Sequence, residues 1–460
     1  MLSKERKVHF VGIGGVGMSG LASILASMGH IVSGCDLQKN KYTRKLENEG
    51  IKVYTGHSAE HLEDVDIVVY SSAIPSDNPE LVKAKEKGLW VIPRAQMLSE
   101  VMNLYKKSIV VAGSHGKTTT TSMIAETLIK LDQNPTVIVG GIINNINSHS
   151  VLGKGEYLVA EADESDGSFL CYSPYIEVIT NIDAEHLDFY ADFNAVKKAF
   201  VNFINRCSPE GKVVLCGDDK GVREVLEEIS GPFLLYGFSK ENHLRAELLR
   251  EEKGCESFKV IYKGKKLGEL RLFVPGKHNV LNALACIGVA IELGLPVEKV
   301  FKALEEFKGV ARRFDYKGIF KKAILLDDYA HHPREIEVTL SAIRKVFPQK
   351  SICLIFQPHR YTRTRALWED FLLVLKKPDI LVLTEIYPAS EKPLPGVSGE
   401  SFFESIKKLR GSAPTFFAKT LEDAKNIVEI LAEEEMVLVT MGAGDIYKLH
   451  RKLKENEGKF

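Results

Sequence analysis

The residues best suited to chemistry lie in the stretch Gly113–Thr119, which reads Gly-Ser-His-Gly-Lys-Thr-Thr. An apolar run over residues 108–112 precedes it and predicts a buried strand, while apolar residues between 123 and 131 recur at helical spacing. A strand, a glycine loop, a Lys-Thr pair and a helix in this order are typical of the phosphate-binding loop of an NTPase. Backbone N–H groups of such a loop surround phosphate oxygens, and the helix N-terminus adds its positive end.

The side chains of this loop have distinct expected roles. Lys117 supplies a point charge for the outer phosphates of ATP, and the Thr118 hydroxyl supplies a ligand for Mg²⁺. The general motif places a glycine where this chain has Val111, so the loop is a shorter variant. The alternative is a Gly-Lys-Thr turn without a ligand, which the flanking strand and helix disfavour. The predicted ATP-binding residues of the loop are Gly113, Ser114, His115, Gly116, Lys117, Thr118 and Thr119.

Acidic residues that follow a short predicted strand at 157–160 are candidates for holding the metal. Glu161 ends that strand, and an acid in this place beside a phosphate loop is where such enzymes hold Mg²⁺. The acids at 163, 164 and 166 either share this role or form a solvated turn. His186 follows another predicted strand, at 176–180. A lone histidine is often structural, but its place beside the expected metal favours function.

Two asparagines offer a further contact to ATP. Asn279 and Asn282 stand three residues apart and therefore share one face of a predicted helix. An asparagine amide carries both a donor and an acceptor, which together match the edge of adenine. We predict that both residues bind ATP.

A second glycine-rich loop lies near the N-terminus. Residues 8–13 predict a strand, Gly12–Gly17 reads Gly-Ile-Gly-Gly-Val-Gly, and a strand at 31–35 ends at Asp36. This matches the dinucleotide fingerprint, with an acid about 20 residues beyond the glycines. The pattern predicts a pyrophosphate at a helix N-terminus, and NAD, FAD and UDP-sugars all carry one. The residues predicted to bind this ligand are Gly14, Gly15, Val16, Gly17, Met18, Asp36, Ser71 and Ser72, although the two serines equally suit a simple turn.

Polar clusters follow three predicted strands in the last third of the chain. The strands at 323–326, 352–356 and 380–383 are each followed by polar residues, and carboxyl ends of parallel strands form one edge of a sheet. Arginine and histidine dominate this rim, and guanidinium groups grip carboxylates bidentately. The sequence therefore predicts a site for a small carboxylate. The residues expected there are Tyr329, His331, His359, Arg360 and Arg363.

Alternating strands and helices position all three sites and predict an α/β fold with three domains. A Rossmann-like domain is expected over residues 1–105, a central P-loop ATPase-type α/β domain over 106–310, and a second Rossmann-like domain over 311–460. A further strand is predicted at 436–440. Residues 240–270 are charged and strand-like, and we interpret them as an antiparallel edge without chemistry.

The composition narrows the class of protein. The chain has 460 residues and 45% hydrophobic content, which predicts substantial cores. Lys+Arg and Asp+Glu are both 61, and this balance argues against nucleic acid or an anionic membrane as the main partner. The seven cysteines are scattered and never form a Cys-x-x-Cys pair, which predicts reduced thiols in a cytoplasmic protein and neither a disulfide framework nor a zinc site. We also expect neither a signal peptide nor a membrane span. The oligomeric state stays open.

Taken together, these motifs resemble the Mur ligases, ATP-dependent amide-forming enzymes of peptidoglycan synthesis, over nearly the whole chain. The motifs that carry the resemblance are Gly113–Thr119, Glu161–Asp166, Asn181–His186, Gly276–Asn279 and Arg312–Phe314. The departure at Val111 is that family's own variant. Within the family, Gly12–Met18, Asp328–Pro333 and Gln357–Thr364 are most similar to members that join L-alanine to UDP-N-acetylmuramate.

The resemblance implies a two-step reaction that uses ATP, UDP-N-acetylmuramate and L-alanine, with Mg²⁺ as cofactor. It gives Thr118 and Glu161 to one Mg²⁺ and His186 to a second, and it brings Arg313 to the phosphates, with Arg312 as the alternative. Either His331 or His186 assists deprotonation of the amine. Whether Asp36 meets uracil or ribose stays open, and no role is assigned to Lys197 or Lys198. A tripeptide-recycling ligase, a nucleotide-sensing module and an NAD-dependent enzyme are the alternatives.

Overall fold

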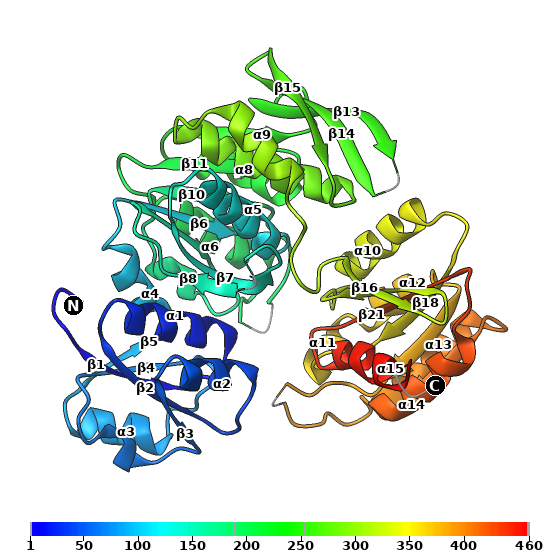
Figure 1. The fold of residues 1–460 in the computed structure, drawn as a ribbon, viewed down its shortest axis with the longest axis horizontal. Coiled ribbons are helices and arrows are strands. Elements are labelled where there is room, and N and C mark those ends of the chain that lie inside the picture. The colour runs from blue at the N-terminus through cyan, green and yellow to red at the C-terminus, as the bar shows by residue number, and fades with distance from the viewer. Residues whose placement is uncertain (1, 147, 187–188, 253, 390, 458–460) are drawn as a thin grey trace. The chain divides into compact units, whose positions relative to one another are not determined.

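The computed structural model describes residues 2–146, 148–186, 189–252, 254–389 and 391–457 (Figure 1). They divide into two compact units, the first drawn from Met1–Arg250, Ser257–Phe273 and Lys277–Lys308, the second from Glu251–Glu256, Val274–Gly276 and Gly309–Phe460. Among the described residues, every helix falls short of the length or apolar content that crossing a membrane requires.

The N-terminal part of the first unit is a five-stranded parallel sheet in the order β3-β2-β1-β4-β5. Its strands are β1 (Lys7–Val11), β2 (Ile31–Asp36), β3 (Lys52–Thr55), β4 (Ile67–Tyr70) and β5 (Trp90–Pro93). Its helices are α1 (Val16–Ser27), α2 (Lys41–Asn48), the 3₁₀ helix η1 (Ala59–Leu62), α3 (Pro79–Glu86) and α4 (Arg94–Met102). The strand order reverses at β1, and open α/β sheets bind ligands where the order reverses. The N-terminal glycine loop, residues 12–17, therefore lies at a position suited to a ligand.

The central sheet has ten strands in the order β15-β14-β13-β12-β11-β10-β6-β9-β7-β8. The strands are β6 (Lys107–Ala112), β7 (Thr136–Ile143), β8 (Ser148–Val151), β9 (Tyr157–Glu161), β10 (Ile176–Ile179), β11 (Lys212–Cys216), β12 (Phe233–Gly237), β13 (Leu244–Glu252), β14 (Cys255–Tyr262) and β15 (Lys265–Leu272). The helices are α5 (Lys117–Lys130), η2 (Ser168–Cys171), α6 (Phe193–Ile204), α7 (Lys220–Val225), η3 (Leu226–Glu228), α8 (Lys277–Glu292) and α9 (Val297–Glu305). Strand β6 pairs in parallel with β9 and β10, so the ends of three strands surround the start of α5.

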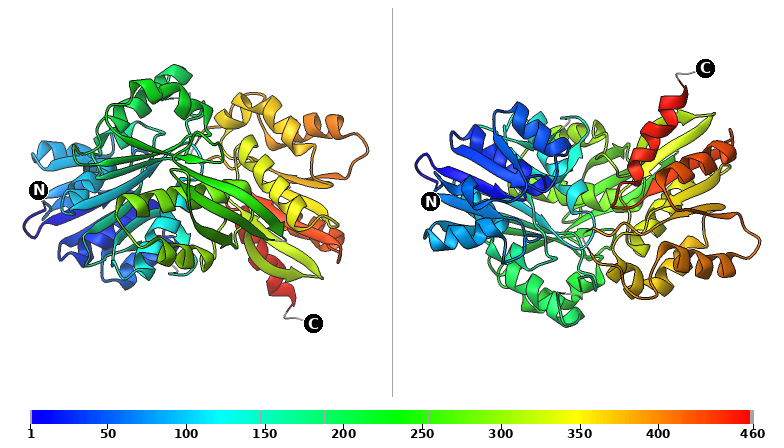
Figure 2. Two further views of the ribbon diagram at one scale, coloured as in Figure 1. Left: turned by 90° about the horizontal axis from the view of Figure 1, so that it is seen from above. Right: turned by 90° about the horizontal axis from the view of Figure 1, so that it is seen from below.

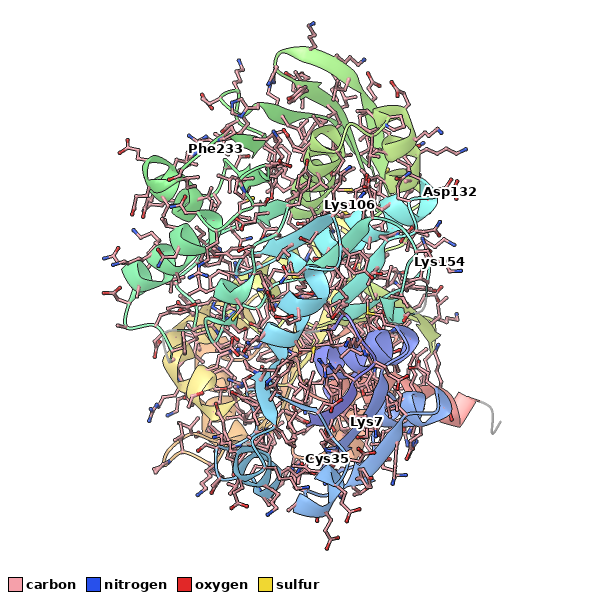
Figure 3. The ribbon with its side chains drawn as sticks, turned by 90° about the vertical axis from the view of Figure 1, so that its left-hand side faces the viewer. Lys7, Cys35, Lys106, Asp132, Lys154 and Phe233 are labelled. Atoms are coloured by element: carbon pink, nitrogen blue, oxygen red, sulfur yellow. The ribbon has the colours of Figure 1, made fainter. Side chains whose placement is uncertain are left out.

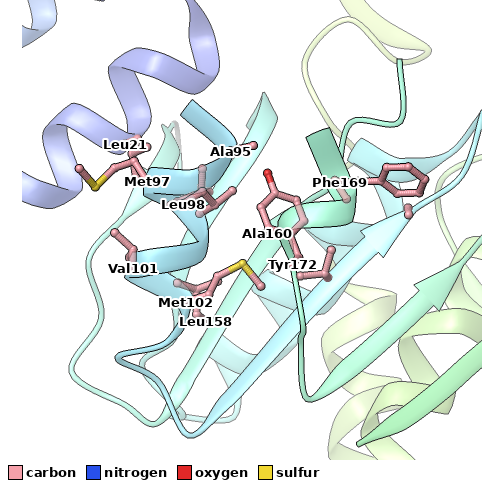
Figure 4. Close-up of a cluster of buried hydrophobic side chains, with 14 of the residues drawn as sticks. Leu21, Ala95, Met97, Leu98, Val101, Met102, Leu158, Ala160, Phe169 and Tyr172 are labelled. Carbon is pink, nitrogen blue, oxygen red and sulfur yellow. The ribbon is translucent and has the colours of Figure 1, made fainter. Parts of the chain in front are cut away.

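A shared apolar core joins the two sheets of the first unit (Figure 4). Leu21 of α1 and Leu98 of α4 belong to the same buried cluster as Leu158 and Ala160 of β9. All four side chains are at most 1% exposed. Burial of a leucine side chain stabilises a fold by roughly 1.5–3 kcal/mol, so this core fixes the two sheets as one unit.

The second unit contains a six-stranded sheet in the order β16-β17-β21-β18-β19-β20, parallel except for β16. Its strands are β16 (Asp315–Phe320), β17 (Ala323–Asp328), β18 (Ser351–Phe356), β19 (Ile380–Thr384), β20 (Thr415–Ala418) and β21 (Met436–Met441). Its helices are α10 (Pro333–Val346), α11 (Tyr361–Ala366), α12 (Trp368–Leu375), α13 (Gly399–Arg410), α14 (Leu421–Leu431), η4 (Ile446–Lys448) and α15 (Leu449–Glu457).

Helices cover both faces of this sheet (Figure 2). Leu354 and Phe356 of β18 pack in the same cluster as α10, α12 and α13. Cys353 and Ile355, the alternate residues, pack with α14 and α15 on the other face. This alternation is what a doubly covered parallel strand requires, and it explains why such strands read as continuous apolar runs.

The structure confirms the predicted α/β class and each strand that was predicted from an apolar run, with ends shifted by at most two residues. The charged stretch at 240–270 forms β13, β14 and β15 at one edge of the central sheet, as expected. Only two residues connect β14 to β15, and so short a connection requires an antiparallel pair. The domain limits at 105/106 and 310/311 stay predictions.

Candidate functional site

The glycine loop at the start of α5 is built around backbone conformations that only glycine adopts readily. Gly113 and Gly116 have φ of 133° and 81°. A Cβ added at Gly113 would lie 2.1 Å from Thr180 Oγ1, and one at Gly116 would lie 2.9 Å from Asn282 Oδ1. The loop is therefore pressed against its neighbours, with the first N–H groups of α5 at its end.

Lys117 is held inside this loop by contacts with the chain itself. Its Nζ donates to the carbonyl oxygens of Gly113 and Ser114 at 2.5 and 3.3 Å, and it lies 2.9 Å from Glu164 Oε2. Burial alone would lower the pKa of Lys117, but the carboxylates of Glu164, Asp163 and Glu161 outweigh it and raise the pKa. The ammonium is thus charged and aimed by the loop at the place where phosphates are expected.

Thr118 and Glu161 lie together as predicted. Thr118 Oγ1 donates to the two carboxylate oxygens of Glu161 at 2.9 and 3.1 Å. The backbone N–H of Gly140 also donates to Glu161 Oε2 at 2.8 Å. A hydroxyl and a carboxylate oxygen in contact are the hard oxygen donors that Mg²⁺ prefers, so these side chains fit that ion. Their role as its ligands stays a proposal.

Glu164 takes a part that the sequence left open. Its side chain is only 2% exposed, which excludes a solvated turn for this residue, whereas Asp163 is exposed. His186 Nε2 lies 3.5 Å from Glu164 Oε1 and 3.7 Å from Glu185 Oε2, and these residues form a group able to hold a metal ion. Burial lowers the pKa of His186, but the hydrogen bond and charge of Glu164 reverse the effect and raise it.

The chain around His186 is held in an unusual backbone conformation. His186 has φ of 56°, a value that costs about 1–3 kcal/mol for a residue other than glycine and that occurs often at functional sites. Leu187 and Asp188, which follow His186 in the chain, lie outside the described residues. The strain is consistent with the predicted role of His186.

Residues after β10 support the loop from the other side. The N–H of His115 donates to Asn181 Oδ1 at 2.7 Å, and Asn181 Nδ2 donates back to the His115 carbonyl at 3.0 Å. His115 Nε2 lies 3.1 Å from Asp183 Oδ2, and the Asp183 N–H donates to Ser114 Oγ at 2.9 Å. The run from Asn181 to Asp183 therefore fixes the loop, a function that spacing in the sequence did not reveal.

Asn279 and Asn282 are both buried at the start of α8 and contact each other. Asn282 Nδ2 donates to Asn279 Oδ1, and Asn282 Oδ1 accepts from Thr120 Oγ1, each at 3.1 Å. These contacts place both asparagines against α5, behind the phosphate loop. Binding of adenine by either residue stays a prediction.

The N-terminal glycine loop is closed by Asp36. The N–H of Gly14 donates to Asp36 Oδ2 at 2.8 Å, and Asn40 Nδ2 donates to the Gly14 carbonyl at 3.1 Å. Gly15 is the N-cap of α1, with Val16, Gly17 and Met18 in its first turn. Contact of Asp36 with the loop itself was not foreseen, and neither was the part of Asn40.

Ser71, Ser72 and Arg94 are the other side chains near the N-terminal glycine loop, and they differ in exposure and in their contacts. Ser71 Oγ accepts from the N–H of Ala73 at 3.4 Å, which is the turn considered as the alternative for this serine. Ser72 is exposed. A Cβ added at Gly17 would lie 3.1 Å from Arg94 Nη1, so Arg94 brings a cation to the loop. No motif pointed to Arg94, because its partner lies far away in the sequence.

The second unit separates the roles of the two neighbouring arginines. Arg312 donates from Nε to Asp327 at 3.1 Å and from Nη2 to the Gly442 carbonyl at 2.5 Å, so it anchors its own unit. Arg313 lies 3.5 Å from Glu335 Oε1 and is 31% exposed. This difference favours Arg313 over Arg312 as the phosphate contact, which stays a prediction.

Most of the predicted carboxylate site is brought together in the second unit. Arg363 Nη1 lies 3.3 Å from His359 Nδ1, and His359 stacks on Tyr387 at 5.6 Å. The rings of His331 and His359 lie 6.0 Å apart. Tyr329 contacts His331, with ring centroids 5.3 Å apart, and both Arg312 and Arg313 lie over its ring. The side chain of Arg360 is exposed. Its backbone has φ of 71°, and its N–H donates to the Tyr387 carbonyl at 2.9 Å.

Burial shifts the pKa of three groups in this cluster. Desolvation lowers the pKa of His331 to about 4 and that of His359 to about 3, with the Arg363 charge adding to both. Desolvation also raises the pKa of Asp328 to about 6. Both histidines are therefore neutral at pH 7.

These pKa values predict that the second unit loses stability as the pH falls from 7 to 5. Below pH 6.5 His331 and His359 bind protons in the unfolded chain but not in the folded chain. The free energy of unfolding therefore decreases as the pH falls. Asp328 acts in the opposite direction below about pH 6 and offsets one of the two histidines. The measurement is the thermal midpoint of this unit against pH. His359→Gln should flatten the profile and His278→Gln, at an exposed position, should not; equal profiles would contradict the assignment.

The fold and the site define a class: an α/β protein in which a phosphate-binding loop and a pyrophosphate-type glycine loop lie on adjacent sheets. Family models agree along the chain. The Mur ligase family catalytic domain matches residues 7–106, the Mur ligase middle domain residues 111–290, and the Mur ligase glutamate ligase domain residues 312–444. The chain belongs to the Mur ligase family, and its three α/β domains are those of that family.

Individual relatives are similar from end to end. The chain is 46% identical to the UDP-N-acetylmuramate–L-alanine ligase of Solidesulfovibrio magneticus, covering 99% of both chains. It is also 46% identical to the enzyme of that name from Geobacter sulfurreducens, covering 97% of both. The crystal structure of the UDP-N-acetylmuramate–alanine ligase of Thermotoga maritima matches with a TM-score of 0.85 at 33% identity, over 99% of this chain and 100% of that one.

Proposed function

We propose that this protein is an ATP-dependent ligase that joins L-alanine to the carboxylate of UDP-N-acetylmuramate during peptidoglycan precursor synthesis. The observation that carries the proposal is the 44–46% identity, over nearly full length, to relatives that bear the name of this reaction. The phosphate loop, the pyrophosphate-type loop and the cationic cluster supply one site for each substrate. An NAD-dependent enzyme would leave Lys117 and the cationic cluster without a purpose.

In this proposal ATP binds at the loop of residues 113–119. Lys117 would hold the outer phosphates, and Thr118 and Glu161 would hold one Mg²⁺. His186 would hold a second Mg²⁺, with Glu164 as a further candidate because of its contacts with both Lys117 and His186. When bound, Mg²⁺ neutralises charge on the transferring phosphoryl group. Asn279, Asn282 and Arg313 complete the assignment to ATP.

UDP-N-acetylmuramate is assigned to the N-terminal loop. The residues proposed for it are Gly14, Gly15, Val16, Gly17, Met18, Asp36, Ser71 and Ser72. The N–H groups at the start of α1 face the pyrophosphate in this assignment, and Arg94, close to Gly17, adds a positive charge. We assign substrate binding, ATP binding and amino-acid binding to residues 1–105, 106–310 and 311–460, respectively.

The proposed reaction has two steps. A carboxylate oxygen of the muramyl group attacks the γ-phosphorus of ATP, which forms an acyl phosphate and releases ADP. The neutral amine of L-alanine then attacks the acyl carbon, and inorganic phosphate leaves as the amide forms. The amine must first lose a proton, and His331 or His186 is proposed to accept it. The lowered pKa of His331 makes it the weaker base, whereas the raised pKa of His186 makes it the stronger one.

The assignments of partner and location follow from the same reasoning. Balanced charge supports small-molecule substrates as the partners, in preference to nucleic acid or an anionic membrane. The seven cysteines are all free thiols, which supports a cytoplasmic location. We assign no oligomeric state.

The test is an ADP-release assay with purified protein, ATP, Mg²⁺ and UDP-N-acetylmuramate, to which amino acids are added one at a time. We expect the highest kcat/KM for L-alanine, with glycine and L-serine lower by roughly 10–200-fold, because a pocket discriminates one small group only by that much. Preference for a tripeptide would make the protein a recycling ligase. Preference for D-glutamate would place it at the next step of the pathway.

Ligand-induced stabilisation separates the proposed N-terminal ligand from a dinucleotide. UDP-N-acetylmuramate should raise the thermal midpoint, since a ligand at 100 times its Kd stabilises by about 2.7 kcal/mol, whereas NAD and NADP should not. Asp36→Ala should reduce this shift because Asp36 closes the loop on Gly14. Asp66→Ala is the matched control, since Asp66 contacts Lys7 elsewhere in the same sheet. A shift with NAD alone would overturn the assignment.

A further inference from the structure

A group of metal-binding side chains lies in the N-terminal sheet, apart from every site described so far. His9 of β1, Cys35 of β2, His61 of η1 and Glu80 of α3 each offer one ligand atom, and the four atoms lie within 4.8 Å of one another. His9, Cys35 and Glu80 are fully buried, and the side chain of His61 is 13% exposed. Cys35 is labelled in Figure 3, in the blue N-terminal part of the ribbon.

The spacing of these atoms suits a tetrahedral ion. Bonds of the usual Zn–N, Zn–O and Zn–S lengths place neighbouring ligand atoms about 3.3–3.6 Å apart. Cys35 Sγ lies 2.8 Å from Glu80 Oε2, and His9 Nε2 lies 3.5 Å from Glu80 Oε1. His61 Nδ1 is in direct contact with Glu80 Oε1. Small movements of side chains are therefore enough to bring all four ligands to one ion.

The surroundings orient two of these ligands. His9 Nδ1 lies 2.9 Å from Ser33 Oγ, and a proton donated there leaves the Nε2 lone pair directed into the cluster. His9 Nε2 is buried, and Glu80 Oε1, at 3.5 Å, lies beyond the usual length of a hydrogen bond to it. The ring of His61 stacks on Tyr54 at 4.0 Å, which fixes its plane. A buried nitrogen atom with only one long polar contact is uncommon in folded proteins, and an ion at this cluster would give it a closer ligand bond.

The charges also match a divalent cation. A thiolate and a carboxylate together carry two negative charges, and two neutral imidazoles add none, so a Zn²⁺ complex of these four ligands is neutral. A neutral complex is far less costly to bury than an isolated ion. Thiolate and imidazole ligands favour zinc over Mg²⁺, which prefers oxygen donors.

We propose that His9, Cys35, His61 and Glu80 form a structural zinc site that ties β1, β2, η1 and α3 together. Binding forms one Zn–S, two Zn–N and one Zn–O bond and releases the Cys35 thiol proton to solvent. His57, whose Nδ1 lies 3.1 Å from Cys35 Sγ and 3.2 Å from Glu80 Oε2, is placed to support these two ligands. Cys35 precedes Asp36, which closes the glycine loop on Gly14, so the ion would also steady that loop.

The test uses the full-length protein, stripped with a chelator, then loaded with Zn²⁺ or Co²⁺ in excess Mg²⁺, which occupies sites built from oxygen ligands. Zinc is counted by elemental analysis after gel filtration, and Co²⁺ is followed by the thiolate-to-metal charge-transfer band. We expect one zinc per chain and a charge-transfer band in the cobalt form. Zinc should also raise the thermal midpoint of the first unit, which contains the N-terminal sheet.

Matched variants show whether the metal is at this cluster. Cys35→Ala should abolish the band, and Cys35→Ala and His61→Asn should each weaken zinc binding at least tenfold. Cys353→Ala, which removes another buried thiol in the second unit, should change neither. The partly exposed position of His61 makes its variant suitable if Cys35→Ala does not fold. Absence of bound zinc in the native protein, or equal binding in His61→Asn, would overturn the proposal and leave a hydrogen-bonded network around Glu80.

Discussion

Lys117→Ala is expected to lower ATP-dependent turnover at least ~10²-fold, the loss typical of removing one preorganised charge partner at a reacting group. The reason is local. Lys117 Nζ is held by the carbonyl oxygens of Gly113 and Ser114, so its charge is positioned before ATP arrives. The measurement is the steady-state rate of ADP release with saturating UDP-N-acetylmuramate and L-alanine.

The control variant removes the same charge from the same helix. Lys130→Ala deletes a lysine at the end of α5, where it pairs with Glu126 and Glu306, and should leave turnover close to normal. Loss of Lys117 also leaves the buried Glu164 with only His186 as a basic neighbour, so the thermal midpoint must be measured alongside the rate. The thermal shift caused by UDP-N-acetylmuramate should persist in Lys117→Ala. Near-normal turnover in a folded Lys117→Ala protein would remove the phosphate loop from the mechanism.

The central strands of all three sheets were predictable because they are buried on both faces. Residues 109–112 of β6 and 352–356 of β18 are uninterrupted apolar runs, and hydrophobic patterning is at its strongest for such strands. Edge strands gave a weaker pattern. β3 (Lys-Val-Tyr-Thr) and β20 (Thr-Phe-Phe-Ala) have four residues each, lie at sheet edges and are mostly half-buried or exposed. These edge strands form because they pair with a neighbouring strand, and the pattern of residues along the chain gives no information about that pairing.

The candidate site divides in the same way. Lys117, Thr118 and Glu161 were identifiable because a loop, a helix start and a strand end fix their positions locally. Glu164 was not, because four acids in a run of six residues differ only in which one turns inward. The folded chain resolves this: Glu164 is buried against Lys117, whereas Asp163 is exposed. Arg94 beside Gly17 and the support of the loop by Asn181 likewise depend on contacts distant in sequence.

The proposed zinc site also depends on contacts between residues that are distant in the sequence. His9, Cys35, His61 and Glu80 are spread over about seventy residues and match none of the usual spacings of a zinc motif. Only the parallel order of β2, β1 and β4, with α3 packed beside them, brings the four side chains together. Cysteine counting in the sequence favoured reduced thiols without a metal, and the structure gives a reason to test that expectation for Cys35.

Arg363→Ala should raise the KM for L-alanine by roughly 10–150-fold, which corresponds to losing charge-assisted hydrogen bonds worth about 1.5–3 kcal/mol. Arg363 lies in α11 with Nη1 3.3 Å from His359 Nδ1, and His359 is itself held by stacking on Tyr387. Because the pKa of His359 is lowered to about 3, the ring is neutral and does not repel the guanidinium. A guanidinium oriented in this way suits the α-carboxylate of an amino acid.

The expected effect is specific to one substrate, and this specificity is what makes the experiment decisive. The KM values for ATP and UDP-N-acetylmuramate should change by less than about threefold, because we assign those substrates to the first two domains. Arg365→Ala removes a guanidinium two residues away in α11, at an exposed position, and should change none of the three constants. Arg363→Lys should restore little, since an ammonium cannot reproduce a bidentate contact. An equal rise in all three KM values would point to unfolding of the cluster, and an unchanged KM for L-alanine would move the carboxylate contact to Arg360, whose side chain is exposed beside it in sequence.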